Sequence, residues 1–198
     1  MARKREFDPE VALDRAVQVF WQQGYADTSI DDVVSATGVN RYGLYSAFGD
    51  KHALFVRVLQ RYQHLIVEQR LSGVRRPDAS VHDILAFFEM FKLLARQREG
   101  ATWGCLLCNA LAELGTTDED VRQAGDVYAS TFEQAFGAAL SNSVAAGHLP
   151  PDFDCGLEAQ HLTIVVAGLS VLSKSGFREE SVDRTIDASI YGLRRALM

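Results

Sequence analysis

The sequence predicts an all-α fold of about nine helices. Its 198 residues include only four prolines, and no run alternates β-branched with polar residues as a half-buried strand would. The hydrophobic share is 47%, which provides a sizeable core. We expect two parts, a small N-terminal helical domain in residues 1–52 and a larger helical domain in residues 53–198.

The first helix is expected to begin at Asp8 and Pro9, because Asp is a good N-cap and Pro tolerates the first helical position. Gly24 should end this helix. Its buried stripe is Leu13, Ala16, Val17, Phe20 and Trp21.

Residues 27–51 predict two short helices joined by a tight turn. Thr28 and Ser29 are good N-cap residues, and Asp31 and Asp32 each lie three residues after one of them, as a capping box requires. Gly38 should end the first of these helices, because glycine adopts the left-handed conformation at little cost.

The second of these helices is expected to start after Asn40. Leu44 and Phe48 are four residues apart and share one face, which should point inward. The opposite side then presents Arg41, Tyr42, Tyr45 and Ser46 to solvent. A short helix with this surface suits the DNA major groove, which is about 12 Å wide. Two helices packed inside an all-α domain, without DNA, are the alternative.

The run TSIDDVVSATGVNRYGLYSAFGDKHALF resembles the DNA-binding domain of the TetR family of bacterial repressors. The likeness covers about the first 60 residues. Matching positions are Thr28, Ser29, Ile30, Val33, Gly38, Val39, Arg41, Leu44, Tyr45, Phe48, Lys51 and Leu54. The chain departs from the family pattern at Asn40, Tyr42 and Gly43, so the resemblance does not imply an operator sequence.

The resemblance implies a helix-turn-helix that binds double-stranded operator DNA. We expect Asn40, Arg41, Tyr42, Gly43 and Tyr45 to face bases and phosphates. The DNA backbone is expected to contact Thr28, Ser29, Lys51 and the basic arm formed by Arg3, Lys4 and Arg5, although that arm is equally well a solvated terminus.

The net charge of −6 at first opposes a nucleic-acid partner. Residues 1–76 carry 11 Lys and Arg against 9 Asp and Glu, whereas residues 77–198 carry 9 against 17. Because the remainder is acidic, DNA contacts must come from a few placed groups.

After Gly49, a helix is expected from Lys51 to about Leu71, with Lys51 and His52 at an N-terminus that attracts phosphate. It would link the DNA-binding part to the rest of the chain. Further helices are expected at about residues 80–97, 102–114, 119–146, 154–173 and 179–197.

The last two expected helices carry apolar stripes. One stripe is Leu157, His161, Ile164, Gly168, Val171 and Leu172, and the other is Val182, Ile186, Ile190, Leu193 and Leu197. Two such helices from each of two chains can form a four-helix interface, as the resembled family does. We therefore expect a homodimer, against the alternative that both stripes are buried within one chain.

The resembled family also implies a small-molecule effector of unknown identity, bound in the C-terminal domain. Candidate ligand-binding residues are Phe88, Phe91, Trp103, Cys105, Cys108, Asn109, Tyr128 and Phe132, with Phe87, Phe136 and His64 also considered. For each of these residues an ordinary place in the core is the alternative.

Cys105 and Cys108 are three residues apart on a predicted helix, and three interpretations are open. They are buried small hydrophobes, a thiol sensor of oxidants or electrophiles, or part of a metal site with Cys155 and His161. No Lys or Arg lies within a turn to lower a thiol pKa, which weakens the sensor interpretation.

The sequence shows neither the apolar segment of a signal peptide nor an apolar stretch of about 18 residues or more. Three cysteines, an odd number, disfavour a secreted disulfide framework. We expect a cytoplasmic, ligand-responsive repressor with no cofactor, no metal, no catalytic residue and no membrane partner. A helical protein-interaction module and an enzyme remain as alternatives, although no phosphate loop or strand pattern supports the latter.

Overall fold

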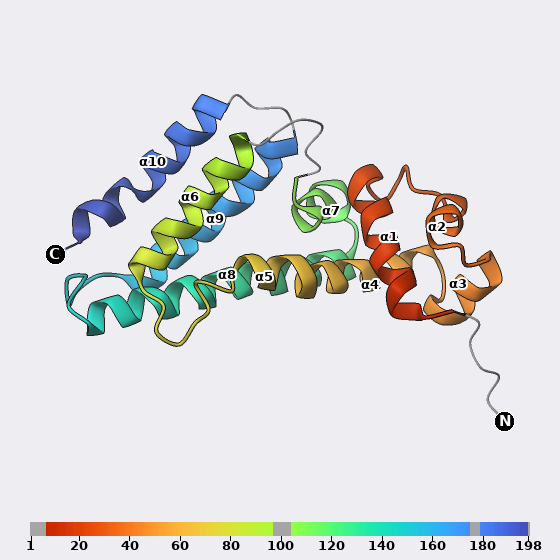
Figure 1. Ribbon diagram of the computed structural model, residues 1–198, viewed down its shortest axis with the longest axis horizontal. Helices are drawn as coiled ribbons and strands as arrows, with labels where there is room; N and C mark the ends of the chain where they lie inside the picture. The colour runs from red at the N-terminus through yellow and green to blue at the C-terminus, as the bar shows by residue number, and fades with distance from the viewer. Residues whose placement is uncertain (1–6, 97–103, 175–178, 198) are drawn as a thin grey trace. The chain divides into compact units, whose positions relative to one another are not determined.

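The computed structural model describes residues 7–96, 104–174 and 179–197. When the uninterrupted helical stretch from Lys51 to Arg70 is taken as one, these residues form nine helices and no strand, which confirms the all-α prediction. The chain divides into two compact units (Figure 1). Unit 1 is Met1–Ile66 with Leu106–Gly125, and unit 2 is Val67–Cys105 with Asp126–Met198.

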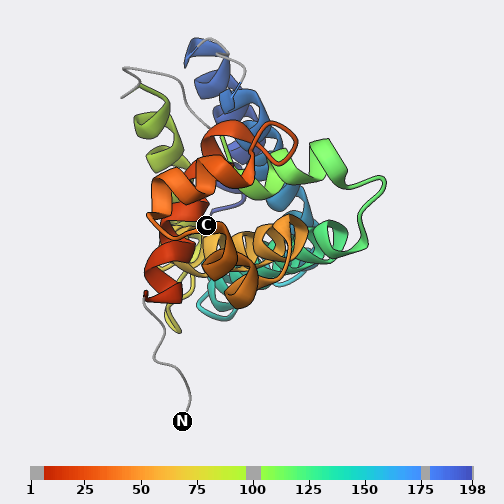
Figure 2. The same cartoon turned by 90° about the vertical axis from the view of Figure 1, so that its right-hand side faces the viewer.

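Unit 1 contains α1 (Pro9–Gln23), α2 (Ile30–Thr37), α3 (Arg41–Phe48), α4 (Lys51–Tyr62), α7 (Leu106–Leu114) and the start of α8 (Glu119–Ala145). Helix α1 packs on α2 and α4, and α3 packs on both α2 and α4. These helices, red to orange in Figure 2, cross one another instead of running parallel. Their core consists mainly of Leu13, Phe20, Val33, Leu44, Leu54, Phe55 and Leu59.

The expected helix ends in unit 1 are confirmed. Asp8 caps α1 by accepting the Glu10 N–H, and Ser29 forms a full capping box with Asp32. Gly38 ends α2 with φ 72° and ψ 7°, the left-handed conformation that favours glycine. Because Gly38 ends α2, it sets the direction in which the chain continues into α3.

Helix α4 does not continue as a regular α-helix to about Leu71, as the sequence predicted, although the helical stretch itself is continuous to Arg70. A π-helical turn, η1 (Gln63–Val67), follows it, and α5 (Glu68–Arg70) is only three residues long. A π-helical turn contains one more residue than an α-helical turn. It lies where the chain passes from unit 1 into unit 2, between Ile66 and Val67.

Unit 2 contains α6 (Val81–Arg96), the remainder of α8, α9 (Cys155–Lys174) and α10 (Glu179–Ala196). Helix α10 lies beside α6 and α9 (Figure 1). The core of unit 2 includes the fully buried side chains of Ile84, Phe88, Phe136, Leu140, Leu162, Ile186 and Ile190.

The two apolar stripes of α9 and α10 have different environments. On α10, Val182, Ile186, Ile190 and Leu193 are buried within the protomer, so the expectation that they form an intermolecular interface is corrected. On α9, Leu157, Ile164 and Val171 are exposed. Only the α9 stripe is therefore available to a partner chain.

Helix α7 begins at Leu106, later than expected, and residues 102 and 103 of its predicted start lie outside the described residues. By packing, α7 belongs to unit 1 together with α4, whereas the sequence analysis divided the chain linearly after residue 52. That division stays a prediction about functional domains. The compact units differ from it because a segment distant in sequence folds back onto the N-terminal helices.

Candidate nucleic-acid interface

Helix α3 presents the expected outer face. Leu44 is 1% exposed and Phe48 is half-buried, so the side carrying these two residues faces the interior of unit 1. On the other side Tyr42 is 82% exposed and Tyr45 is 41% exposed. Arg41 and Ser46 are exposed as well. The arrangement confirms the geometry on which the DNA-binding hypothesis depends.

Asn40 and Gly43 serve the start of α3. The side chain of Asn40 accepts the Gly43 N–H at 2.8 Å and so caps the helix. A Cβ at Gly43 would lie 2.9 Å from Val39 Cγ1 and 3.2 Å from Phe7 Cε1. The packing of Phe7 and Val39 therefore explains the glycine, and a contact between Gly43 and DNA stays a prediction.

The hydroxyls of Thr28 and Ser29 are used within unit 1. Thr28 is 1% exposed, and its hydroxyl donates to the Gly24 carbonyl at 2.6 Å. Ser29 exchanges hydrogen bonds with Asp32 in the capping box. Ser29 is exposed and lies at the α2 N-terminus, where a phosphate is favoured. A contact between DNA and the buried Thr28 stays a prediction that its geometry does not favour.

Lys51 and His52 at the start of α4 already have partners. The Lys51 ammonium lies 4.3 Å from the centre of the Tyr25 ring, a cation–π contact. His52 Nε2 lies 2.7 Å from Asp118 Oδ2, just before α8. Among the described residues no carboxylate forms an ion pair with Lys51, whereas His52 contacts Asp118, and a contact between Lys51 and DNA stays a prediction.

Asp118 belongs to a group of three side chains able to offer metal ligands. His52, Asp118 and Asp120 place one ligand atom each within 4.8 Å of one another. Burial alone raises the pKa of Asp118, but hydrogen bonds from the Val121 N–H and His52 lower it overall. Both α4 and α8 begin at this group, and the positive ends of two helices disfavour a cation. The geometry therefore favours a hydrogen bond between His52 and Asp118 here, without a metal ion.

Glu113 on α7 was not identified from the sequence. Its carboxylate accepts the backbone N–H groups of Tyr25 and Ala26 at 3.0 and 2.6 Å, in the turn between α1 and α2. The carboxylate thus ties α7 to the backbone that leads into the helix-turn-helix. Only the fold brings these residues together, because they are 88 and 87 positions apart.

The candidate effector residues fall into separate groups. In unit 2, the rings of Phe88, Phe91, Tyr128 and Phe132 belong to one aromatic cluster that also includes Phe87 and Phe136. Cys105 is buried in unit 2, whereas the buried Cys108 and half-buried Asn109 belong to unit 1. Trp103 lies outside the described residues, as do the arm residues Arg3, Lys4 and Arg5.

Comparison with known families matches both parts of the chain. Residues 12–58 match the family described as bacterial regulatory proteins, tetR family, and residues 80–189 match the tetracyclin repressor-like C-terminal domain. The chain belongs to the TetR family. TetR-family proteins are transcription regulators and not enzymes, so the enzyme alternative is set aside.

Individual TetR-family relatives agree over most of the chain. It is 30% identical over 176 residues to the HTH-type transcriptional repressor ComR of Escherichia coli, covering 88% of this chain and 83% of the relative. It is 31% identical to the repressor BdcR of the same organism, covering 92% and 87%.

A solved structure of a TetR-family protein also superimposes on this chain. It is that of a cysteine mutant of the regulator CifR complexed with 26-bp double-strand operator DNA. The TM-score is 0.80 at 26% identity, and the match covers 96% of this chain and 98% of the CifR chain.

Proposed function

We propose that this protein is a repressor that binds operator DNA through the exposed face of α3 and is released by a small-molecule effector. One observation carries the proposal: in a TetR-family helix-turn-helix, α3 directs Arg41, Tyr42 and Tyr45 away from the protein. Arginine can bond guanine bidentately, and tyrosine hydroxyls reach phosphate oxygens. Ser29 and Lys51 are assigned to the DNA backbone.

The protein is proposed to act as a homodimer through α9. Leu157, Ile164 and Val171 are 65%, 72% and 46% exposed and recur every seven residues, so they form one apolar stripe. A dimer also gives two recognition helices, which read two half-sites about one helical turn apart or a multiple of it. The exposed side of α10, which includes Tyr191, would flank this interface.

The apolar character of α9 is also typical of a membrane-spanning helix. By length and composition this 20-residue helix could cross a membrane, the one such helix in the part of the chain that the structure describes. This is weak support, because core helices pass the same test. A helix apolar on both sides is also what a dimer needs, one side buried in the protomer and the other in the interface. We therefore assign the protein to the cytoplasm.

The effector is proposed to be a largely apolar molecule that contacts the aromatic cluster of α6 and α8. Ring faces of Phe91, Tyr128 and Phe132 suit such a ligand. The thiol-sensor alternative is not favoured, because Cys105 and Cys108 are 3% and 5% exposed and thus poorly accessible to an oxidant. A thermal-shift screen of small molecules tests the proposal, and hits should be weakened by Phe132→Ala.

Selection of DNA from a random library tests the DNA-binding proposal. The wild-type protein should enrich a two-fold related sequence. Tyr42→Ala and Arg41→Ala should weaken binding to the selected duplex about tenfold or more each, the range for a lost base or phosphate contact. Val127→Ala is the control, because it truncates an exposed side chain on α8, outside both α3 and the proposed α9 interface, and should not change affinity. Failure to enrich any sequence would refute the proposal.

A further inference from the structure

The helix-turn-helix carries an unfavourable charge for a DNA-binding element. Within residues 27–51, all of which the structure describes, there are four aspartates, Asp27, Asp31, Asp32 and Asp50, against only Arg41 and Lys51. Phosphate attraction supplies essentially all non-specific DNA affinity. A segment with this charge balance therefore has a low affinity for non-specific DNA unless its few cations are free to contact phosphates.

Arg41, the one cation on α3, already has a carboxylate partner. Its Nη2 lies 2.7 Å from Oδ1 of Asp31 on the first turn of α2. The hydrogen bond and the charge of Asp31 raise the pKa of Arg41. Both side chains remain largely exposed, so the pair lies on the surface that carries Tyr42 and Tyr45.

The ion pair leaves most donors of Arg41 usable. A guanidinium has five N–H donors, and Asp31 takes one of them. The uncharged acceptors of a guanine edge can bond the remaining donors while Asp31 stays in place. An anionic phosphate, in contrast, meets the negative charge of Asp31 beside the guanidinium, so the paired Arg41 attracts it less.

We infer that Asp31 is a specificity-determining residue, which keeps Arg41 from binding phosphates indiscriminately while leaving it able to bond base edges. The inference rests on the proposed DNA binding through α3. It assigns to Asp31 a function that the fold does not otherwise require. Asp32, not Asp31, forms the capping box of α2, and Ser35 bonds only the backbone carbonyl of Asp31.

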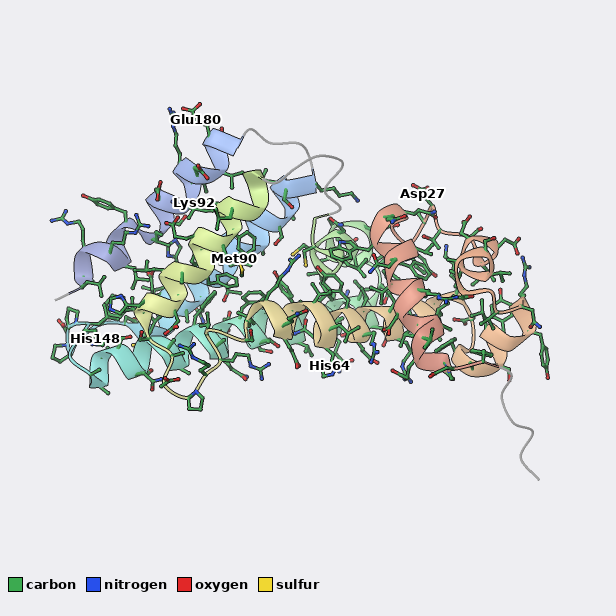
Figure 3. The ribbon with its side chains drawn as sticks, in the orientation of Figure 1. Asp27, His64, Met90, Lys92, His148 and Glu180 are labelled. Carbon is green, nitrogen blue, oxygen red and sulfur yellow. The ribbon has the colours of Figure 1, made fainter. Side chains whose placement is uncertain are left out.

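Asp31→Asn and Asp27→Asn form a matched pair of variants. Each removes one negative charge from an exposed aspartate close to the α2 N-terminus. Asp27, labelled in Figure 3, makes no side-chain hydrogen bond or ion pair with another described residue, whereas Asp31 binds Arg41. Both variants therefore reduce the repulsion between the protein and the DNA by one negative charge. Only Asp31→Asn also frees Arg41 from its ion pair.

The experiment measures the affinity of the full-length protein for two duplexes at several salt concentrations. One is a duplex of about 30 bp, three helical turns, selected by the wild-type protein from a random library, and the other is its shuffled sequence. Asp31→Asn should tighten binding to the shuffled duplex about fivefold and steepen its salt dependence by about one ion, because Arg41 then neutralises a phosphate. Affinity for the selected duplex should change less than about twofold, so the specificity ratio falls.

The same change in an Arg41→Gln background completes the test. There Asp31→Asn should have the small effect of Asp27→Asn, because no arginine remains to be released. Equal effects of Asp31→Asn and Asp27→Asn in the wild-type background would overturn the inference, as would a loss of affinity for the selected duplex alone. A wild-type protein that does not prefer any duplex would instead refute the proposed function. Thermal melting of each variant establishes that α2 is intact.

Discussion

Helices α9 and α10 carry similar apolar stripes, but the α10 stripe is buried within the protomer and the α9 stripe is exposed. On α10, Val182, Ile186, Ile190 and Leu193 are at most 5% exposed, because α6 and α9 cover them. On α9, the stripe of Leu157, Ile164 and Val171 faces away from the protomer. Both stripes have helical spacing, so spacing identifies an apolar face but not the element that covers it.

The two helices differ in what lies on their other sides. Helix α9 has a second apolar side, Leu162, Val166 and Leu169, which is buried in unit 2. Helix α10 has one apolar side, and its remaining surface carries charged residues such as Arg184, Asp187 and Arg194. A helix with two apolar sides needs two partners. The protomer supplies one partner for α9, and a second protomer is proposed to supply the other.

Ile164→Arg should produce the largest effect, loss of the dimer. Placing an unpaired charge in a buried interface costs about 3–5 kcal/mol, which weakens association a hundredfold or more. Analytical ultracentrifugation at micromolar concentration should then show a monomer with unchanged helical circular dichroism. Operator affinity should fall when the dimer is lost, since a monomer has one recognition helix and reads only one half-site.

The control for this substitution is Arg at position 134, where Gln134 is exposed on α8 and so lies outside the proposed α9 interface. Gln134→Arg should leave the sedimentation coefficient at the value of the wild type. If both variants remain dimeric, α9 does not form the interface, and the distinction between the two helices fails.

Ile186→Ala on α10 should lower the stability of the protomer and leave the dimer intact, the reverse of the effect of Ile164→Arg. The side chain is fully buried within unit 2, and truncating a buried isoleucine lowers the free energy of unfolding by about 2–4 kcal/mol. Urea denaturation monitored by circular dichroism measures the change. Because Ile186 belongs to the protomer core, the folded variant should still dimerise. A variant of normal stability that dissociates would show that the α10 stripe is the interface after all.

The sequence predicted the local features of the helix-turn-helix well. The sequence predicts helix starts at Asp8, Ser29 and Asn40, and the structure has its caps at these residues. Each is decided by the chemistry of one side chain and the N–H groups within three residues of it. The exposed face of α3 follows from the same short-range logic, since the inward direction of Leu44 fixes the direction of its neighbours.

Features that depend on distant residues were not predictable. The pairing of Arg41 with Asp31 requires the angle between α2 and α3, and the bonds of Glu113 to Tyr25 and Ala26 require α7 to fold back onto unit 1. The π-helical turn after Tyr62 likewise leaves no mark in an otherwise regular helical pattern. Periodicity describes one helix at a time, whereas the contacts of Arg41 and Glu113 join two elements.

A group of ion pairs borders the buried stripe of α10. Lys92 on α6, labelled in Figure 3, bonds Asp187 at 2.6 Å and Glu89 at 3.1 Å. Arg194 bonds the same two carboxylates at 3.4 and 2.6 Å. Together with the aliphatic stripe, these pairs attach α10 to α6, whereas the described part of the α9 stripe has no such border.

Asp187→Asn should therefore give the smallest effect, about 1 kcal/mol or less, because the carboxylate is half exposed. Hydrogen bonding from Lys92 lowers the pKa of Asp187, against an opposing effect of burial. A lowered pKa means that the stability is present above the ordinary Asp value of about 4 and disappears as the pH falls through the lowered value. Urea unfolding at a series of pH values should thus show the variant weaker at neutral pH and equal to the wild type at strongly acidic pH. Asp152→Asn, at an exposed position of unit 2, is the control, and its free energy of unfolding should equal that of the wild type at every pH. A stability difference for Asp187→Asn that persists in acid would mean that packing, not charge, holds α10 to α6 at this border.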